Sequence, residues 1–97
     1  MRRVEWSESA LADLHHVRDY LTEHYGPGFA QWNIDILVLA AEWLLDFPRA
    51  GPPLAYRAWR KWKPRKQRHI LVYQPDREGI LVVRVLHDRN DWRPVSK

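Results

Sequence analysis

The sequence of 97 residues contains no cysteine, which removes two classes of structure at once. Without thiols the chain can form neither a disulfide framework nor a thiolate metal site, as is usual for a protein of the reducing cytoplasm. Long apolar runs are also missing. The longest, residues 36–41, is too short to cross a bilayer, and no signal-peptide core follows Met1-Arg2-Arg3. We therefore expect a cytoplasmic protein without membrane contact.

Other missing sequence features exclude several common kinds of catalytic and phosphate-binding site. The sequence has no glycine-rich phosphate loop, no nucleophilic cysteine and no pair of carboxylates within a predicted strand. His16, Asp19 and Glu23 are spaced three and four residues apart, so they could in principle hold a metal ion from one helix face. The commoner role of such residues is a solvated helix face, which we favour here. We expect no metal and no cofactor.

Acidic residues are missing from one long stretch, residues 47–75, and this stretch contains the most basic part of the chain. Residues 57–69, RAWRKWKPRKQRH, hold seven of the sixteen Lys and Arg residues. The rest of the chain is left with nine basic and twelve acidic residues, so the net charge of +4 is local rather than general. A concentrated positive field of this kind attracts polyanions or acidic protein segments.

The composition is that of one globular domain spanning residues 1–97, with 45% hydrophobic and 29% charged residues. The patterning predicts a strand at residues 2–6 and a helix that begins at Ser7 or Ser9. A second helix follows from about residue 29 to 47, after the break at Tyr25-Gly26-Pro27-Gly28. Strands are predicted at residues 56–63, 69–74 and 80–87. We expect an α+β fold of order β-α-α-β-β-β, in which an N-terminal strand and an antiparallel three-stranded meander form one sheet, covered on one face by an antiparallel helical hairpin.

The second helix is apolar around much of its circumference, which indicates that more than one partner covers it. Large apolar residues recur along it at helical spacing, and the widest part of the stripe lies around Trp32, Ile36 and Trp43. We predict that these three residues form an interface with another chain, in a homodimer or in a hetero-oligomer.

The basic stretch is the first candidate site. If residues 56–63 are one strand, Arg57, Trp59 and Lys61 lie on one face together with Lys63. The cations of such a face are suited to binding phosphates, and the indole is suited to stacking on a base. The alternative is an edge strand that Lys and Arg protect from aggregation. The predicted binding residues are Arg57, Trp59, Arg60, Lys61, Lys63, Arg65, Arg68, Arg84, His87 and Arg89.

The second candidate site is the segment RVLHDRNDW, residues 84–92. In an unbroken strand Arg84 and His87 point to opposite faces, so they converge on one ligand only if the strand bulges or ends early. Two alternatives stay open for each residue. Arg84 is either a phosphate ligand or the partner of a nearby Asp, and His87 is either catalytic or capped by Asp88 or Asp91. His69, beside the basic stretch, is a further candidate contact for phosphate.

Three segments resemble the RelE/ParE toxin superfamily. They are VEWSESALADLHHVRDYL at residues 4–21, FPRAGPP at residues 47–53, and HILVYQPDREGILVVRVLHDRNDW at residues 69–92. The resemblance spans nearly the whole chain, and residues 84–91 are its most specific part. It implies a bacterial type II toxin, of the kind linked to plasmid stabilization, that a cognate antitoxin neutralises.

The superfamily holds two activities. RelE-like members cut messenger RNA on the ribosome, and ParE-like members inhibit DNA gyrase without acting as nucleases. Cleavage of RNA requires proton donors and acceptors beside cations. If the chain is an RNase, the resemblance gives its residues as His87, Arg84, Lys61 and Arg68, with His69 or a lysine as a further group.

RNA-cleaving relatives often carry a tyrosine after the last strand, whereas here no tyrosine follows Tyr73. We therefore favour no catalytic residues and a ParE-like toxin that binds gyrase. The RelE-like nuclease, with ribosome and messenger RNA as partners, is the alternative. A third alternative is an inactive member that binds only its antitoxin.

Overall fold

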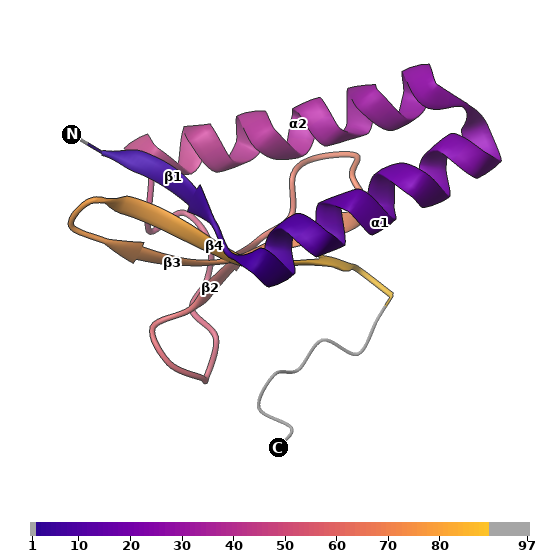
Figure 1. Cartoon of the computed structure of the whole chain (residues 1–97). Coiled ribbons are helices and arrows are strands. Elements are labelled where there is room, and N and C mark those ends of the chain that lie inside the picture. Colours follow the sequence, from indigo (N-terminus) through magenta and orange to yellow (C-terminus); the bar gives the residue numbers. More distant parts are fainter. Residues whose placement is uncertain (1, 90–97) are drawn as a thin grey trace.

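The computed structural model describes residues 2–89, which form two layers (Figure 1). The elements are β1 (Arg3–Trp6), α1 (Glu8–Tyr25), α2 (Pro27–Asp46), β2 (Arg60–Trp62), β3 (His69–Asp76) and β4 (Gly79–His87). Both helices lie on the same face of one four-stranded sheet of order β1-β4-β3-β2. The predicted α+β class and element order are confirmed. No helix in the described part of the chain has the length and apolarity needed to cross a membrane.

Helix α1 begins where the sequence predicts, because Ser7 caps it. The Ser7 hydroxyl accepts a hydrogen bond from the backbone N–H of Ala10 at 3.0 Å and donates one to the carbonyl of Val83 at 2.8 Å. The cap therefore also ties the start of α1 to β4. The helix ends at Gly26, whose φ of 97° lies outside the range that L side chains readily adopt.

Helix α2 begins at Pro27, two residues before the predicted start, since proline at the first helical position has the required φ and no N–H to satisfy. Its buried face is formed mainly by small residues and leucines: Ala30, Asn33, Leu37, Ala41 and Leu44. Small side chains let a helix approach its neighbours closely. The large aromatic residues of α2 consequently lie on its other sides, and one of them, Trp43, stacks on Trp62 of β2.

The sheet combines a parallel and two antiparallel pairings. Strand β1 pairs in parallel with β4, while β3 pairs with β4 and β2 in antiparallel fashion. Tyr73 on β3 is fully buried, and its hydroxyl donates to the carbonyl of Pro48 at 2.8 Å and accepts from the N–H of Gly51 at 3.1 Å. These two bonds attach the loop after α2 to the core. Burial raises the pKa of Tyr73, so the ring stays neutral.

Strand β2 is shorter than predicted. The sequence pattern indicated residues 56–63, but only Arg60–Trp62 form the strand. The reason is Arg57, whose φ of 56° is left-handed and interrupts any extended backbone. The outer edge of β2 is instead paired by the preceding loop, since Leu54 donates to the carbonyl of Trp59 and Lys61 donates to that of Pro52. The predicted face of Arg57, Trp59, Lys61 and Lys63 therefore does not form.

Candidate functional site

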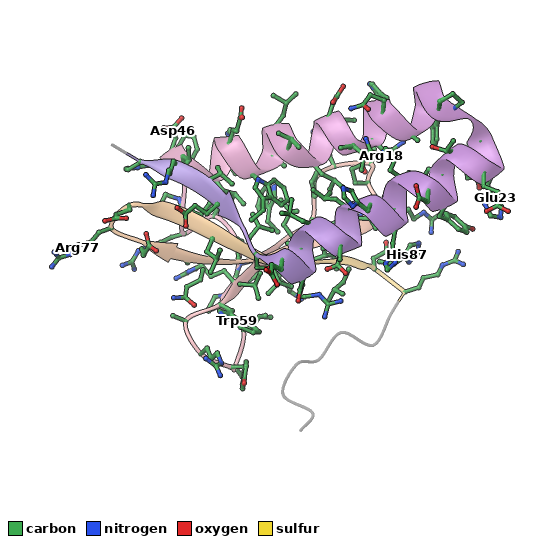
Figure 2. The ribbon with its side chains drawn as sticks, in the orientation of Figure 1. Arg18, Glu23, Asp46, Trp59, Arg77 and His87 are labelled. Atoms are coloured by element: carbon green, nitrogen blue, oxygen red, sulfur yellow. The ribbon has the colours of Figure 1, made fainter. Side chains whose placement is uncertain are left out.

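The basic stretch is divided between two places in the fold. Arg57, Trp59 and Arg60 line a cleft beside β2, and Arg68 lines a second cleft near the ends of β3 and β4. Lys63 and Arg65 are exposed and line neither, whereas Lys61 is half-buried on β2. Figure 2 shows the separation, because the labelled Trp59 and His87 lie well apart. Residues that are consecutive in sequence thus serve two surfaces.

The Arg60 side chain forms hydrogen bonds within the protein. Its guanidinium donates to the carbonyl of Gly51 at 2.7 Å and to that of Arg49 at 3.3 Å. The side chain therefore supports the loop after α2, and only part of its donor capacity remains for a ligand. A substitution at Arg60 would test folding as much as binding.

Arg84 has a partner that its position on β4 does not suggest. Asp13 of α1 accepts from Arg84 Nε at 2.7 Å through Oδ2, and from a terminal nitrogen at 3.0 Å through Oδ1. The same Oδ2 accepts from the backbone N–H of Val85 at 2.8 Å. The hydrogen bonds to Asp13 raise the pKa of Arg84 above its ordinary value. Of the two roles left open for Arg84, the structure shows the ion pair.

A bulge in β4 changes the faces that Arg84 and His87 occupy. The register pairs Val72 with Arg84 and then Tyr73 with Val82, which leaves Val83 without a partner. Val82 and Val85 are both buried although they are three residues apart. The bulge lies before Arg84, so the strand stays regular from Arg84 to His87, and the two residues nevertheless line one surface depression together with Asp13. The expected condition, a bulge or strand end between the two residues, is not met, yet both residues border the same depression.

His87 and His69 form a pair at the ends of β4 and β3. The two residues face each other in the register, and their ring centroids are 5.2 Å apart at an interplanar angle of 86°. Burial, followed by the charge of His87, lowers the pKa of His69 below its ordinary value of 6.5. His69 is therefore neutral at pH 7 and can accept a proton.

The second imidazole has a defined tautomer. The backbone N–H of Arg89 donates to His87 Nδ1 at 3.0 Å, so the proton of the neutral ring is on Nε2. Asp88 Oδ1 lies 3.3 Å from the same Nδ1 and has no hydrogen-bond partner among the described residues. Asp88 is thus placed to form an ion pair if His87 is protonated. Asp91, the other predicted cap, lies outside the described residues.

The histidine pair lies in a cleft of about 480 Å³, termed here the histidine cleft. Cations and aromatic rings line it: Lys66, Arg68, Arg89, Tyr20, Tyr25 and Phe29. The sequence interpretation missed the two tyrosines because it looked for them only after the last strand, and they come from α1. It also missed Lys66, which has a left-handed φ of 60°. Cations, rings and imidazoles together suit an anionic ligand with a planar base.

Metal-binding groups do not gather elsewhere. Within residues 2–89, no three His, Asp or Glu side chains lie close enough to hold a metal ion, and this includes His16, Asp19 and Glu23.

The profile of one protein family, the ParE toxin of the type II toxin–antitoxin system parDE, matches residues 4–92, which include all described helices and strands except the first residue of β1. The chain belongs to the ParE toxin family. The fold is also that of a chain in the solved structure of the chromosomal ParDE TA system from P. aeruginosa, with a TM-score of 0.79 at 20% identity over 90% of this chain and 96% of that chain. No curated protein sequence matches this one.

Membership of the ParE toxin family confirms the resemblance found in the sequence, on its ParE side. It also directs attention to surfaces that bind other macromolecules. The most prominent apolar one is the outer face of α2, where Phe29, Trp32, Leu39, Trp43 and Phe47 are between 42% and 62% exposed. Ile36 is half-buried. The ring of Trp43 stacks on the ring of Trp62 in β2, with the two ring centroids 5.1 Å apart. The interface at Trp32, Ile36 and Trp43 stays a prediction.

Proposed function

We propose that this ParE toxin family member inhibits DNA gyrase by binding it in the cytoplasm, and that a cognate antitoxin neutralises it. The observation that carries the proposal is the family match over residues 4–92. The internal bonds of two arginines support a binding rather than a catalytic role. Arg84 is held by Asp13 and Arg60 by backbone carbonyls, so neither is free to neutralise a reacting phosphate in full.

Two assays on the purified protein test the target. We expect inhibition of the supercoiling of relaxed plasmid by gyrase, and intact messenger RNA in a ribosome-dependent translation reaction. The same preparation mixed with its antitoxin is the control, since neutralisation should restore supercoiling. Cleaved message with unaffected supercoiling would overturn the proposal. Neither effect would favour an inactive member that only binds its antitoxin.

The outer face of α2 is the proposed docking site of the antitoxin. Its exposed large side chains at positions 29, 32, 39 and 43 recur at helical spacing, as in helix-in-groove recognition. The charged residues of α2 are all acidic: Asp35, Glu42 and Asp46. Two copies of this face would therefore repel each other, which favours a hetero-oligomer over a homodimer. Light scattering of the toxin alone and with its antitoxin distinguishes the two assemblies.

The pair of histidines in the histidine cleft favours a second function, the RelE-like cleavage of messenger RNA on the ribosome. His69 is neutral and suited to take the 2′-hydroxyl proton, and the imidazolium form of His87, which Asp88 lies close enough to pair with, would donate a proton to the leaving oxygen. Lys66, Arg68 and Arg89 line the same cleft as cations for the phosphate. Message cleavage that is lost in both His69→Ala and His87→Ala would establish this function. Cleavage that survives both substitutions would assign it to a contaminating nuclease.

A further inference from the structure

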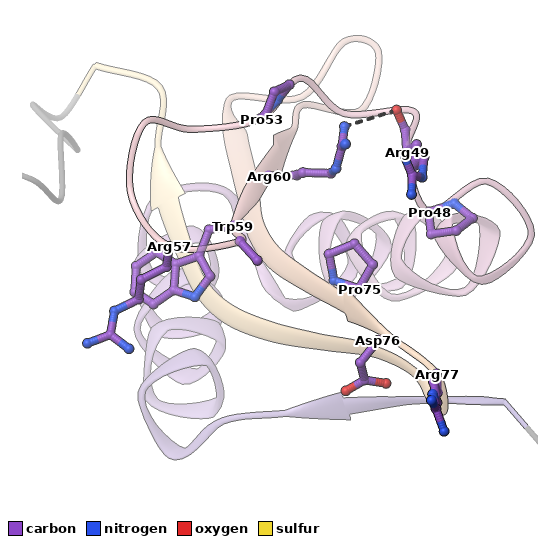
Figure 3. Close-up of a pocket in the computed structure, with 10 residues that line it drawn as sticks. Pro48, Arg49, Pro53, Arg57, Trp59, Arg60, Pro75, Asp76 and Arg77 are labelled. Atoms are coloured by element: carbon purple, nitrogen blue, oxygen red, sulfur yellow. Dashed lines mark hydrogen bonds between the residues drawn. The ribbon is translucent and has the colours of Figure 1, made fainter.

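A second cleft lies at the β2 edge of the sheet, and none of its lining residues lines the histidine cleft. Its volume is about 500 Å³, within the range of roughly 300–1,000 Å³ that ligand pockets cover. Arginines and prolines dominate its lining: Arg49, Arg57, Arg60, Arg77, Pro48, Pro53 and Pro75 (Figure 3). We term it the arginine groove. Trp59 and Asp76 complete its charged and aromatic lining.

The charge of the groove is not balanced from within. Its one carboxylate, Asp76, accepts the N–H of Glu78 at 2.8 Å and so closes the turn between β3 and β4. No carboxylate forms an ion pair with Arg49, Arg57 or Arg77 in the described part of the chain. Three guanidinium groups thus lie around one concave surface, and its single carboxylate, Asp76, forms an ion pair with none of them (Figure 3). Guanidinium forks match carboxylates and phosphates bidentately.

Arg57 is held in place by features that folding alone does not require. Its guanidinium carbon lies 5.1 Å from the centroid of the Tyr56 ring and 5.7 Å from that of Trp59. Its backbone has a left-handed φ of 56°, which disfavours a residue with a side chain by about 1–2 kcal/mol. Glycine would satisfy that backbone without strain. Retained strain of this kind is typical of functional positions.

The state of Trp59 decides between two classes of ligand. A single-stranded nucleic acid would need an open aromatic face for stacking. Here the Arg57 guanidinium covers the Trp59 indole, and the Tyr56 ring packs edge-on against that indole with the ring centroids 5.1 Å apart. The indole Nε1–H donates a hydrogen bond to Oε1 of Gln74 at 3.0 Å. The proline rings offer shallow apolar contacts that suit aliphatic side chains instead. Carboxylates on an extended backbone match both the guanidinium groups and the apolar walls.

We propose that the arginine groove binds an extended acidic peptide segment of a partner protein, with its carboxylates on Arg49, Arg57 and Arg77. This inference does not depend on gyrase as the target, because no residue that lines the groove also lines the histidine cleft or belongs to the exposed apolar side chains of α2. The partner that carries the peptide is defined by its chemistry alone: alternating acidic and small apolar side chains in extended conformation.

The test uses fluorescence anisotropy of a labelled peptide of alternating glutamate and alanine at low ionic strength, where such contacts are strongest. A labelled oligothymidylate of equal charge is the competing probe. We compare the full chain with Arg49→Ala/Arg57→Ala and with Arg18→Ala/Arg65→Ala, a control of equal charge change whose residues line neither the groove nor the histidine cleft. The groove variant should bind the peptide roughly tenfold more weakly or worse, and the control within about twofold of the unmodified chain.

Three results would overturn the proposal. They are no binding of the peptide, equal losses in both double variants, and a preference for the oligonucleotide with the same arginine dependence. Arg57→Gly separates binding from folding, since it removes the guanidinium and relieves the left-handed backbone. It should lose peptide affinity while its thermal midpoint does not fall. Arg57→Lys should recover only part of the affinity, because an ammonium cannot make the bidentate contact.

Discussion

Asp13 holds Arg84 by two hydrogen bonds that connect α1 to β4 next to the bulge at Val83. The carboxylate also accepts the N–H of Val85, so three donors converge on one side chain of which 14% is exposed. The contact has a consequence for function. It occupies a guanidinium that would otherwise be available to an anion, and it attaches β4 to α1 just after the bulge.

Removing the carboxylate should destabilise the protein. Asp13→Ala leaves the backbone N–H of Val85 without its acceptor and Arg84 without its partner, which we expect to lower the free energy of unfolding by about 1–3 kcal/mol. Urea denaturation measures the change. Asp19→Ala, which alters an exposed residue of the same helix, should remain within about 0.5 kcal/mol of the unmodified chain. Equal effects at both positions would contradict the structural role of Asp13.

The glycines at positions 51 and 28 should respond to alanine in opposite directions. A Cβ on Gly51 would lie 2.0 Å from the carbonyl oxygen of Lys61, so the loop or β2 must move, and we expect a loss of about 1–3 kcal/mol. A Cβ on Gly28 meets nothing within 4 Å and lies in the first turn of α2. Gly28→Ala should therefore stabilise by about 0.5–1 kcal/mol. Thermal unfolding of both variants checks the prediction, and a stable Gly51→Ala would refute the tight packing.

The stability of the protein should depend on His69 at mildly acidic pH. The folded state lowers the pKa of His69 below 6.5, so the unfolded state binds the proton more tightly. Stability is complete above the unfolded pKa and falls as the pH drops from 6.5 towards the folded pKa. His69→Gln should flatten this part of the stability–pH curve, as measured by denaturation between neutral and acidic pH. His15→Gln, at an exposed position, is the control and should leave the slope unchanged.

The antitoxin complex should be sensitive to charge on the outer face of α2. Trp32 is 58% and Leu39 is 62% exposed, so replacing both by Glu should leave the fold intact. Buried apolar anchors contribute about 2 kcal/mol or more each at an interface, and the double variant should lose the antitoxin in calorimetry. Leu11→Glu introduces a charge at a 45% exposed residue of α1 and should bind as before. Undiminished binding by the double variant would place the antitoxin elsewhere.

Local signals in the sequence are sufficient to predict most of the fold. Ser7 indicates the start of α1 because its hydroxyl can accept from the first turn, and Gly26-Pro27 indicates both the end of α1 and the start of α2. The hairpin of β3 and β4 follows from turn residues between two apolar strands. Such contacts join residues close together in the chain, which is why patterns detect them.

The geometry of the candidate site depends on contacts between residues far apart in the chain, which local sequence patterns do not reveal. Asp13 and Arg84 are 71 positions apart, and the bulge just before Arg84 arises from packing between β3 and β4. The basic stretch misled the sequence interpretation for a related reason. Left-handed backbone at Arg57 and Lys66, which favours glycine, breaks the expected alternation and distributes neighbouring cations between two clefts.

The parallel pairing of β1 with β4 has a consequence for the synthesis of the protein. β1 is synthesised before both helices, yet the strand it pairs with is the last of the described elements, so β1 has no partner while the helices, β2 and β3 are made. Because β4 lies between β1 and β3, the sheet remains in two parts until β4 has been synthesised. A nascent chain that lacks β4 therefore cannot yet present the completed four-stranded sheet.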